Sequence, residues 1–312
     1  MQRPVSTPST TDRDTPLSRE ELSAFVTPAG SRTARLALAD VVIEMNGLPD
    51  PLADAMAERY GAWMSPGDGG GPGLRVEVVE APVDYFLPPA FAKRWEVYRV
   101  LTGYDGRYFI ATSYRLAWCL DLMRLEGRAV LARGDLDPAP RAMENLLRSA
   151  VAWIAVGRGG LFLHGASIVT GGRCRLFYGP SGAGKSTLAA LSGRGQVLSD
   201  DLTLLMRRPE GLMAVGGPFR GTYDQGEPVR GVFPVTGLYR LKKDAITSVR
   251  RGDAACYADL IGNLPWIVDQ LPRHPELFDR ARAVIGDVPI HALHFRKDED
   301  FWPAIDAGPA GP

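Results

Sequence analysis

The pattern of hydrophobic and polar positions divides the chain into three parts of different character. Residues 1–33 combine Ser, Thr, Pro and charged residues with little apolar periodicity, which predicts a disordered segment with room for one helical turn at 17–22. Residues 34–137 hold short apolar runs separated by turn signals, a pattern typical of strands. Residues 138–312 mix helical and strand periodicities, and we expect them to form one larger domain.

In the strand-rich part, the run 36–45 predicts one strand, and residues 52–63 predict a short helix. The glycine-rich stretch 67–73 is typical of a surface connection. Four further runs predict an antiparallel sheet whose aromatic residues fill a core rather than line a cleft; they are 75–79, 95–100, 108–112 and 114–120.

The last part begins with an apolar stripe at helical spacing over 138–156, which leads into a strand that carries His164. Further strands are predicted at 175–178, 196–199, 202–206, 212–215, 235–241 and 289–295. Helices are predicted at 186–191, at 257–271 with a break at Pro265, and at 275–285, whereas the tail after Trp302 is expected to be loose. This mixture predicts an α/β (α+β) protein with a mixed sheet.

One stretch carries a motif for phosphate binding. Gly179-Pro180-Ser181-Gly182-Ala183-Gly184-Lys185-Ser186 fits G-x-x-x-x-G-K-[ST] without a mismatch, between a predicted strand and a predicted helix. Its glycines allow backbone N–H groups to turn inward, and the new helix adds its positive end. We expect residues 179–187 to bind ATP, with Lys185 reaching the outer phosphates, the Ser186 hydroxyl holding Mg²⁺, and Thr187 next to it.

Two neighbouring carboxylates follow shortly after the loop. Asp200 and Asp201 end the predicted strand 196–199, and only a short helix and a turn separate them from Lys185. They are therefore expected near the phosphates, where one carboxylate near a metal and one near an incoming hydroxyl suit phosphoryl transfer. The alternative is that the pair simply caps a turn.

The order of His164-Gly165, the phosphate loop, a short helix and Ser199-Asp200-Asp201 resembles HPr kinase/phosphorylase and its kinase-like relatives. More distantly it resembles ATP-dependent phosphoenolpyruvate carboxykinase. The clear match covers about fifty residues, and a looser one continues to 295–302. The resemblance implies a mixed-sheet phosphate-loop core of this type in 138–312, preceded by the strand-rich region.

The resemblance also implies roles for single residues. Asp200 matches the base that accepts the hydroxyl proton, Asp201 its neighbour near the metal, and His164 a histidine beside the reacting phosphate; the alternative for His164 is a hydrogen-bonded histidine at a strand end. Adjacent residues on a strand face opposite ways, so the two aspartates can exchange roles. The sequence departs from HPr kinases at Thr187, where they usually carry an acidic residue, and at 228–231, where Pro replaces the Glu of their Glu-Val-Arg-Gly signature.

The polar segment 219–232 offers Arg220 and Arg230 as further contacts to substrate or phosphate, with a solvated surface loop as the alternative. Lys plus Arg equals Asp plus Glu, 36 each, which favours neither nucleic acid nor membrane partners. Three separated cysteines, the absence of a long apolar run and the lack of a signal-peptide pattern predict a cytoplasmic protein. Formation of a homo-oligomer is compatible with the sequence.

The leading hypothesis is a kinase that uses ATP and Mg²⁺ to phosphorylate a hydroxyl, most simply a serine, of a protein or peptide. A small-molecule kinase and a nucleotide-dependent binding module without transfer are alternatives. A carboxykinase is disfavoured because no lysine lies between Lys93 and Lys185 to complete a manganese site. A transport ATPase is disfavoured because its acidic strand lies much further from the loop.

Overall fold

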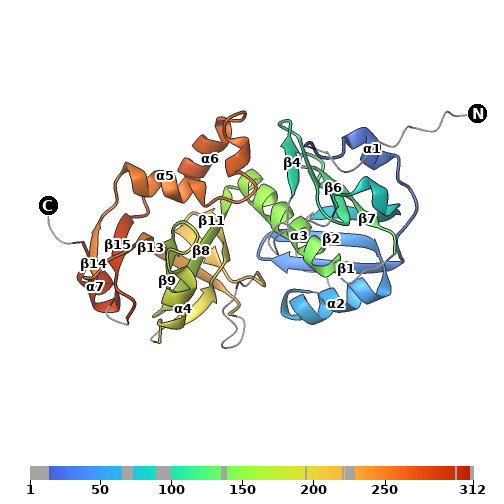
Figure 1. The fold of residues 1–312 in the computed structure, drawn as a ribbon. Helices are drawn as coiled ribbons and strands as arrows, with labels where there is room; N and C mark the ends of the chain where they lie inside the picture. Colours follow the sequence, from blue (N-terminus) through green and yellow to red (C-terminus); the bar gives the residue numbers. More distant parts are fainter. Residues whose placement is uncertain are drawn as a thin grey trace, which may run out of the picture. The chain divides into compact units, whose positions relative to one another are not determined.

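The chain folds into a mixed α/β structure with two mixed sheets and, among the described residues, seven α-helices (Figure 1). The computed structural model describes residues 14–64, 73–88, 100–134, 139–193, 195–219, 221, 229–298 and 301–309. The chain divides into two compact units, Met1–Ala150 and Val151–Pro312, each with its own sheet. No helix within the described ranges is long and apolar enough to cross a membrane.

Unit 1 is built on a seven-stranded sheet in the order β1-β2-β3-β7-β6-β5-β4. Its elements are α1 (Arg19–Ser23), β1 (Arg32–Leu38), β2 (Val41–Leu48), α2 (Asp50–Tyr60), β3 (Leu74–Ala81), β4 (Leu101–Tyr104), β5 (Tyr108–Thr112), β6 (Leu116–Asp121) and β7 (Glu126–Ala132). The expectation of an antiparallel sheet is wrong for β3, which runs parallel to both β2 and β7. Parallel neighbours need a crossover connection, and α2 lies in the one between β2 and β3. The predicted run 95–100 lies almost entirely outside the described residues.

The single strand predicted at 36–45 is a hairpin. Strands β1 and β2 pair through Leu38 and Val41, and the two-residue turn between them places Ala39 at a φ of 47°. Ala39 is not a typical turn residue and no glycine follows Asp40, so the sequence lacks the usual signal for a two-residue hairpin turn.

The prediction of disorder is wrong for residues 14–33, whereas residues 1–13 lie outside the described part. Helix α1 begins with a capping box in which the Ser18 hydroxyl accepts from Glu21 N–H and the Glu21 carboxylate accepts from Ser18 N–H. Leu17 and Leu22 are fully buried against β3, β6 and β7, and Leu17 N–H donates to Thr112 Oγ1 at 2.8 Å. The two leucines, together with main-chain hydrogen bonds from Ala29 to Val78 and from Glu80 to Thr27, anchor this short segment.

Unit 2 holds an eight-stranded sheet with the path β10-β8-β11-β12-β13-β15-β14, and β9 pairs with β8 and β13. Its elements are β8 (Gly160–Thr170), β9 (Arg173–Tyr178), α4 (Lys185–Ala190), β10 (Gln196–Ser199), β11 (Leu202–Arg208), β12 (Gly211–Val215), β13 (Val232–Lys243), β14 (Ser248–Arg251), α5 (Ala254–Gly262), α6 (Glu276–Ile285), β15 (Ile290–Phe295) and α7 (Phe301–Ala307). Helix α3 (Ala139–Gly157) contains the boundary between the units. The expectation of a loose tail after Trp302 is wrong for residues 303–307, where α7 continues and Ile305 is buried.

Helices cover both faces of the sheet of unit 2 (Figure 1). On one face Phe177 lies in a core with Leu188 of α4 and Trp302 of α7. Its neighbour Tyr178 points to the other face, where its hydroxyl donates to the Cys256 carbonyl of α5 at 2.9 Å. The parallel strands β9, β13 and β15 end at one edge of the sheet, and the loop after β9 leaves from that edge.

Candidate functional site

The site forms around the middle of β8, where segments from both edges of that strand meet. On one edge Gly165 pairs with Tyr178, the last residue of β9, so residues 179–184 begin beside it. On the other edge β10 and β11 both pair with β8, and between them Gly165 N–H donates to the Asp201 carbonyl at 2.8 Å. A Cβ at Gly165 would lie 2.8 Å from the Phe177 carbonyl oxygen, so the close approach requires glycine.

The loop between β9 and α4 wraps around the ammonium group of Lys185. Gly182 and Gly184 have φ angles of 76° and 107°, in the left-handed region that favours glycine. Lys185 Nζ donates to the carbonyls of Gly179 at 2.9 Å and Pro180 at 3.4 Å, and the residue is only 9% exposed. Burial lowers the pKa of Lys185, and the nearby Asp201 carboxylate offsets part of this effect.

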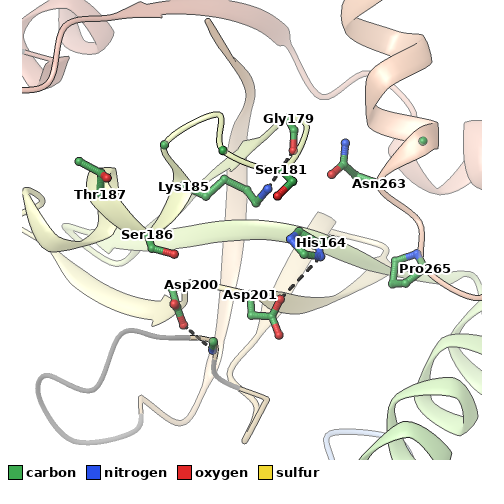
Figure 2. A pocket seen from close by; sticks show the side chains of 14 residues that line it. His164, Gly179, Ser181, Lys185, Ser186, Thr187, Asp200, Asp201, Asn263 and Pro265 are labelled. Atoms are coloured by element: carbon green, nitrogen blue, oxygen red, sulfur yellow. Dashed lines mark hydrogen bonds and ion pairs between the residues drawn. The ribbon is translucent and has the colours of Figure 1, made fainter. Parts of the chain in front are cut away.

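A cavity of about 520 Å³ brings the predicted residues together (Figure 2). It is lined by His164, Gly179, Ser181, Gly182, Gly184, Lys185, Ser186, Thr187, Asp200, Asp201, Gly221, Gly262, Asn263 and Pro265. Pro180 and Ala183 shape the loop from behind, where Ala183 N–H donates to the Pro180 carbonyl at 3.0 Å. The cavity is therefore shared by the loop, the paired aspartates, His164 and the end of α5.

The two aspartates point to different parts of this cavity. Asp200 is 3% exposed, and its Oδ1 accepts from Gly221 N–H at 2.7 Å. Asp201 Oδ1 lies 3.6 Å from His164 Nδ1. In Figure 2 Asp200 lies on the side of Ser186, whereas Asp201 faces His164. The two carboxylates therefore face different groups of the cavity.

Ser199 fixes the bend that turns the aspartates into the cavity. Its hydroxyl donates to the Phe219 carbonyl at 3.1 Å and accepts from the N–H groups of Asp201 and Leu202 at 3.2 and 3.1 Å. Because a hydroxyl can donate once and accept twice, these three contacts use its full capacity. The bend is thus held by the residue that precedes the pair.

Neither family models nor curated proteins match the chain. The side chains that line the cavity supply one buried lysine, two carboxylates, one histidine, the Asn263 amide, and the hydroxyls of Ser181, Ser186 and Thr187.

The oxygen donors suit a hard cation held jointly with a substrate. No group of three or more His, Cys, Asp or Glu capable of holding a metal occurs among the described residues. Mg²⁺ does not require such a cage, because it keeps several waters and is bound through one or two carboxylates plus phosphate oxygens. Ser186, Asp200 and Asp201 line the same cavity as the loop and fit that mode of binding.

Two predicted contacts to substrate or phosphate, and the lining residues that were not predicted, lie further along the chain. Arg230 is exposed and does not line the cavity, and Arg220 lies outside the described residues. Gly221, directly after it, contributes the N–H group that holds Asp200, and a Cβ there would lie 2.8 Å from Asp200 Oδ2. Gly221, Gly262, Asn263 and Pro265 belong to no motif, so the sequence alone offered no signal for them.

Proposed function

We propose that this chain is an ATP-dependent kinase of the HPr kinase-like type, which transfers the γ-phosphate to a hydroxyl, most simply a serine, of a protein or peptide. The observation that carries the proposal is the presence of Lys185 and both aspartates in one cavity. A phosphate loop alone would support nucleotide binding only. A cation for the phosphates together with two carboxylates also supports transfer.

The phosphates of ATP would lie along the loop, with the γ-phosphate toward Lys185. The ammonium group of Lys185 then exchanges its contacts with the Gly179 and Pro180 carbonyls for phosphate oxygens, which are stronger acceptors. Ser186 and Asp200 would hold Mg²⁺, since they lie on the same side of the cavity (Figure 2). The bound cation would neutralise charge on the β and γ oxygens.

For the transfer step we assign the base to Asp201, which reverses the roles that the resemblance implies. The acceptor oxygen forms a bond to the γ-phosphorus while the bond from that phosphorus to the β–γ bridging oxygen breaks, and ADP leaves. The hydroxyl proton passes to Asp201 and then to water. The 3.6 Å approach of His164 to Asp201 supports this assignment, because His164 can orient the carboxylate toward the reacting phosphate.

The experiment that tests the function uses labelled ATP, Mg²⁺ and a panel of hydroxyl-bearing proteins and peptides, with the phosphate located by mass spectrometry. Asp201→Asn should bind ATP normally and lose transfer by roughly two to four orders of magnitude, since it removes a general base. Asp200→Asn should act through Mg²⁺, and excess metal should partly restore its activity. Asp279→Asn, on the exposed side of α6, is the control.

Two results would contradict the proposal. If both asparagine variants transfer phosphate at the parental rate, the carboxylates do not take part in the reaction. If the parent protein binds ATP but neither an acceptor nor water receives phosphate, the chain is a nucleotide-dependent binding module.

A further inference from the structure

One wall of the cavity, at the end of α5, lies beside the phosphate loop and differs from it in chemistry (Figure 2). It is formed by the end of α5, with Gly262, Asn263 and Pro265. The loop presents N–H groups and an ammonium group, which suit phosphate. The role that we assign to this second wall rests on the proposed kinase function.

Asn263 is fixed at both its main chain and its side chain. Its carbonyl accepts from His164 N–H at 2.8 Å, which joins the end of α5 to β8. Its side-chain Nδ2 donates to the Asp259 carbonyl at 2.6 Å, one helical turn back. Because only the amide nitrogen can donate to that carbonyl, the amide cannot turn over without losing the bond.

This arrangement directs the amide oxygen of Asn263 into the cavity. In Figure 2 the amide oxygen lies on the side of Ser181. In the described part of the chain no group donates a hydrogen bond to Asn263 Oδ1. Oδ1 is therefore an acceptor that is already oriented before a ligand binds, which lowers the entropy lost on binding.

Asn263 Oδ1 is poorly suited to contact ATP phosphates. An amide oxygen and phosphate oxygens are all acceptors and repel one another, and the Asp201 carboxylate adds negative charge on the same side as His164. A group that donates hydrogen bonds is the favourable partner at this wall. The donors of ATP are its ribose hydroxyls and adenine amino group, which lie beyond its phosphates, so we assign the donor at this wall, beside His164 and Asp201, to the second substrate.

We propose that Asn263 is a specificity-determining residue that accepts a hydrogen bond from an N–H group of the phosphate acceptor. The favoured acceptors carry an amide or amine N–H close to the reacting hydroxyl, and anionic hydroxy acids are disfavoured. Space for such a substrate exists beside Asn263, because a Cβ at Gly262 would meet no heavy atom within 4 Å apart from its chain neighbours and the backbone of its own helix. The Asn263 contact would hold the hydroxyl near Asp201.

The test compares two small alcohols that differ in one group. In 2-acetamidoethanol the hydroxyl is two carbons from an amide N–H, and in 2-acetoxyethanol an ester oxygen replaces that N–H. With Mg-ATP, the parent protein should phosphorylate the amide with a kcat/KM about tenfold above that of the ester, the loss expected when a built acceptor is left unpaired. Asn263→Leu should reduce this ratio to about one while the KM for ATP stays unchanged.

The ratio of the two kcat/KM values is determined for each variant separately, so a general loss of activity does not change it. Asn263→Ala provides a second measurement if leucine impairs folding. Three results overturn this inference and leave the kinase proposal standing. These are equal phosphorylation of both alcohols by the parent, hydrolysis of ATP by the parent without phosphorylation of either alcohol, and a ratio of kcat/KM values that persists in both variants. If the parent neither transfers phosphate nor hydrolyses ATP, the kinase proposal fails and this inference fails with it.

Discussion

Lys185 keeps its ammonium group inside the loop that precedes it. A buried cation without partners is unfavourable, and the two loop carbonyls at 2.9 and 3.4 Å compensate for part of the lost hydration. Burial still lowers its pKa, so a negatively charged ligand at this position is favoured over water. The unliganded loop is in this sense already arranged for an anion.

Replacing Lys185 tests that arrangement directly. Lys185→Ala should weaken Mg-ATP binding at least tenfold, roughly the value of one charge-assisted hydrogen bond, while the protein stays folded. Isothermal titration calorimetry measures the affinity, and circular dichroism checks the fold. Lys243→Ala, an exposed lysine at the end of β13 that does not line the cavity, should bind as the parent does. Equal affinity for all three proteins would show that the phosphate-loop assignment is wrong.

At the scale of residues, the sequence predicted the groups that lie close together along the chain. The phosphate loop and the aspartate pair are recognisable because their spacing is fixed within some twenty residues. Asn263 and Gly221 were not predicted, since they reach the cavity only through the path of α5 and the segment after β12. Contacts created by tertiary topology leave no local pattern to read.

At the scale of elements, most predictions in unit 2 are confirmed, and most errors lie in unit 1. Strand β10 and helices α3 and α4 match their predicted ranges within about a residue. Helix α3 has a long apolar stripe at helical spacing, and the phosphate loop fixes the positions of α4 and β10 after it. The hairpin of β1 and β2 and the parallel placement of β3 were missed. Strand direction depends on which strands become neighbours, and a single strand pattern does not contain that information.

One hairpin in unit 1 gives a prediction with a defined pH dependence. Asp121 ends β6, accepts from the N–H groups of Met123 and Arg124 in the turn to β7, and pairs with Arg107 at 2.5 Å. The Arg107 hydrogen bond is the main cause that lowers the pKa of Asp121 from 3.8 to about 2. A carboxyl group with a lowered folded pKa stabilises the fold above its unfolded pKa and loses that contribution as pH falls.

Asp121→Asn should therefore destabilise unit 1 at pH 7 by about 1–3 kcal/mol, the range for hydrogen bonds to a charged group. The difference from the parent should shrink as pH falls from about 4 to about 2, and urea unfolding followed at several pH values measures it. Asp84→Asn, at an exposed position, is the control. A difference that does not change over this range would contradict the role of the ion pair.

At the scale of the whole molecule, every described residue of the cavity lies within Val151–Pro312. Leu17 and Leu22, by contrast, belong to the core of Met1–Ala150. The residues that stabilise the first unit are therefore different from those that line the cavity of the second unit. This separation makes their contributions measurable one at a time.

Deleting residues 1–33 should destabilise unit 1 by at least about 2 kcal/mol, since removing even one buried leucine costs that much. Mg-ATP affinity should stay within error of the parent, because residues 14–33, the described part of the deleted segment, do not line the cavity. Thermal unfolding and calorimetry provide the two measurements, and deletion of 1–13 alone is the control. A large loss of ATP affinity in a folded protein would show that the segment supports the nucleotide site.

The attachment of the site to the middle of β8 has a consequence for how the protein acquires its activity during folding. The phosphate loop and the aspartates lie within about forty residues of Gly165 along the sequence. Only short segments of chain therefore have to close into loops to bring them beside Gly165. Asn263 joins His164 from about one hundred residues away, which requires a slower long-range closure. A newly made chain would thus form the phosphate-binding part of the cavity first. The part that selects the acceptor would form later, when α5 docks onto β8.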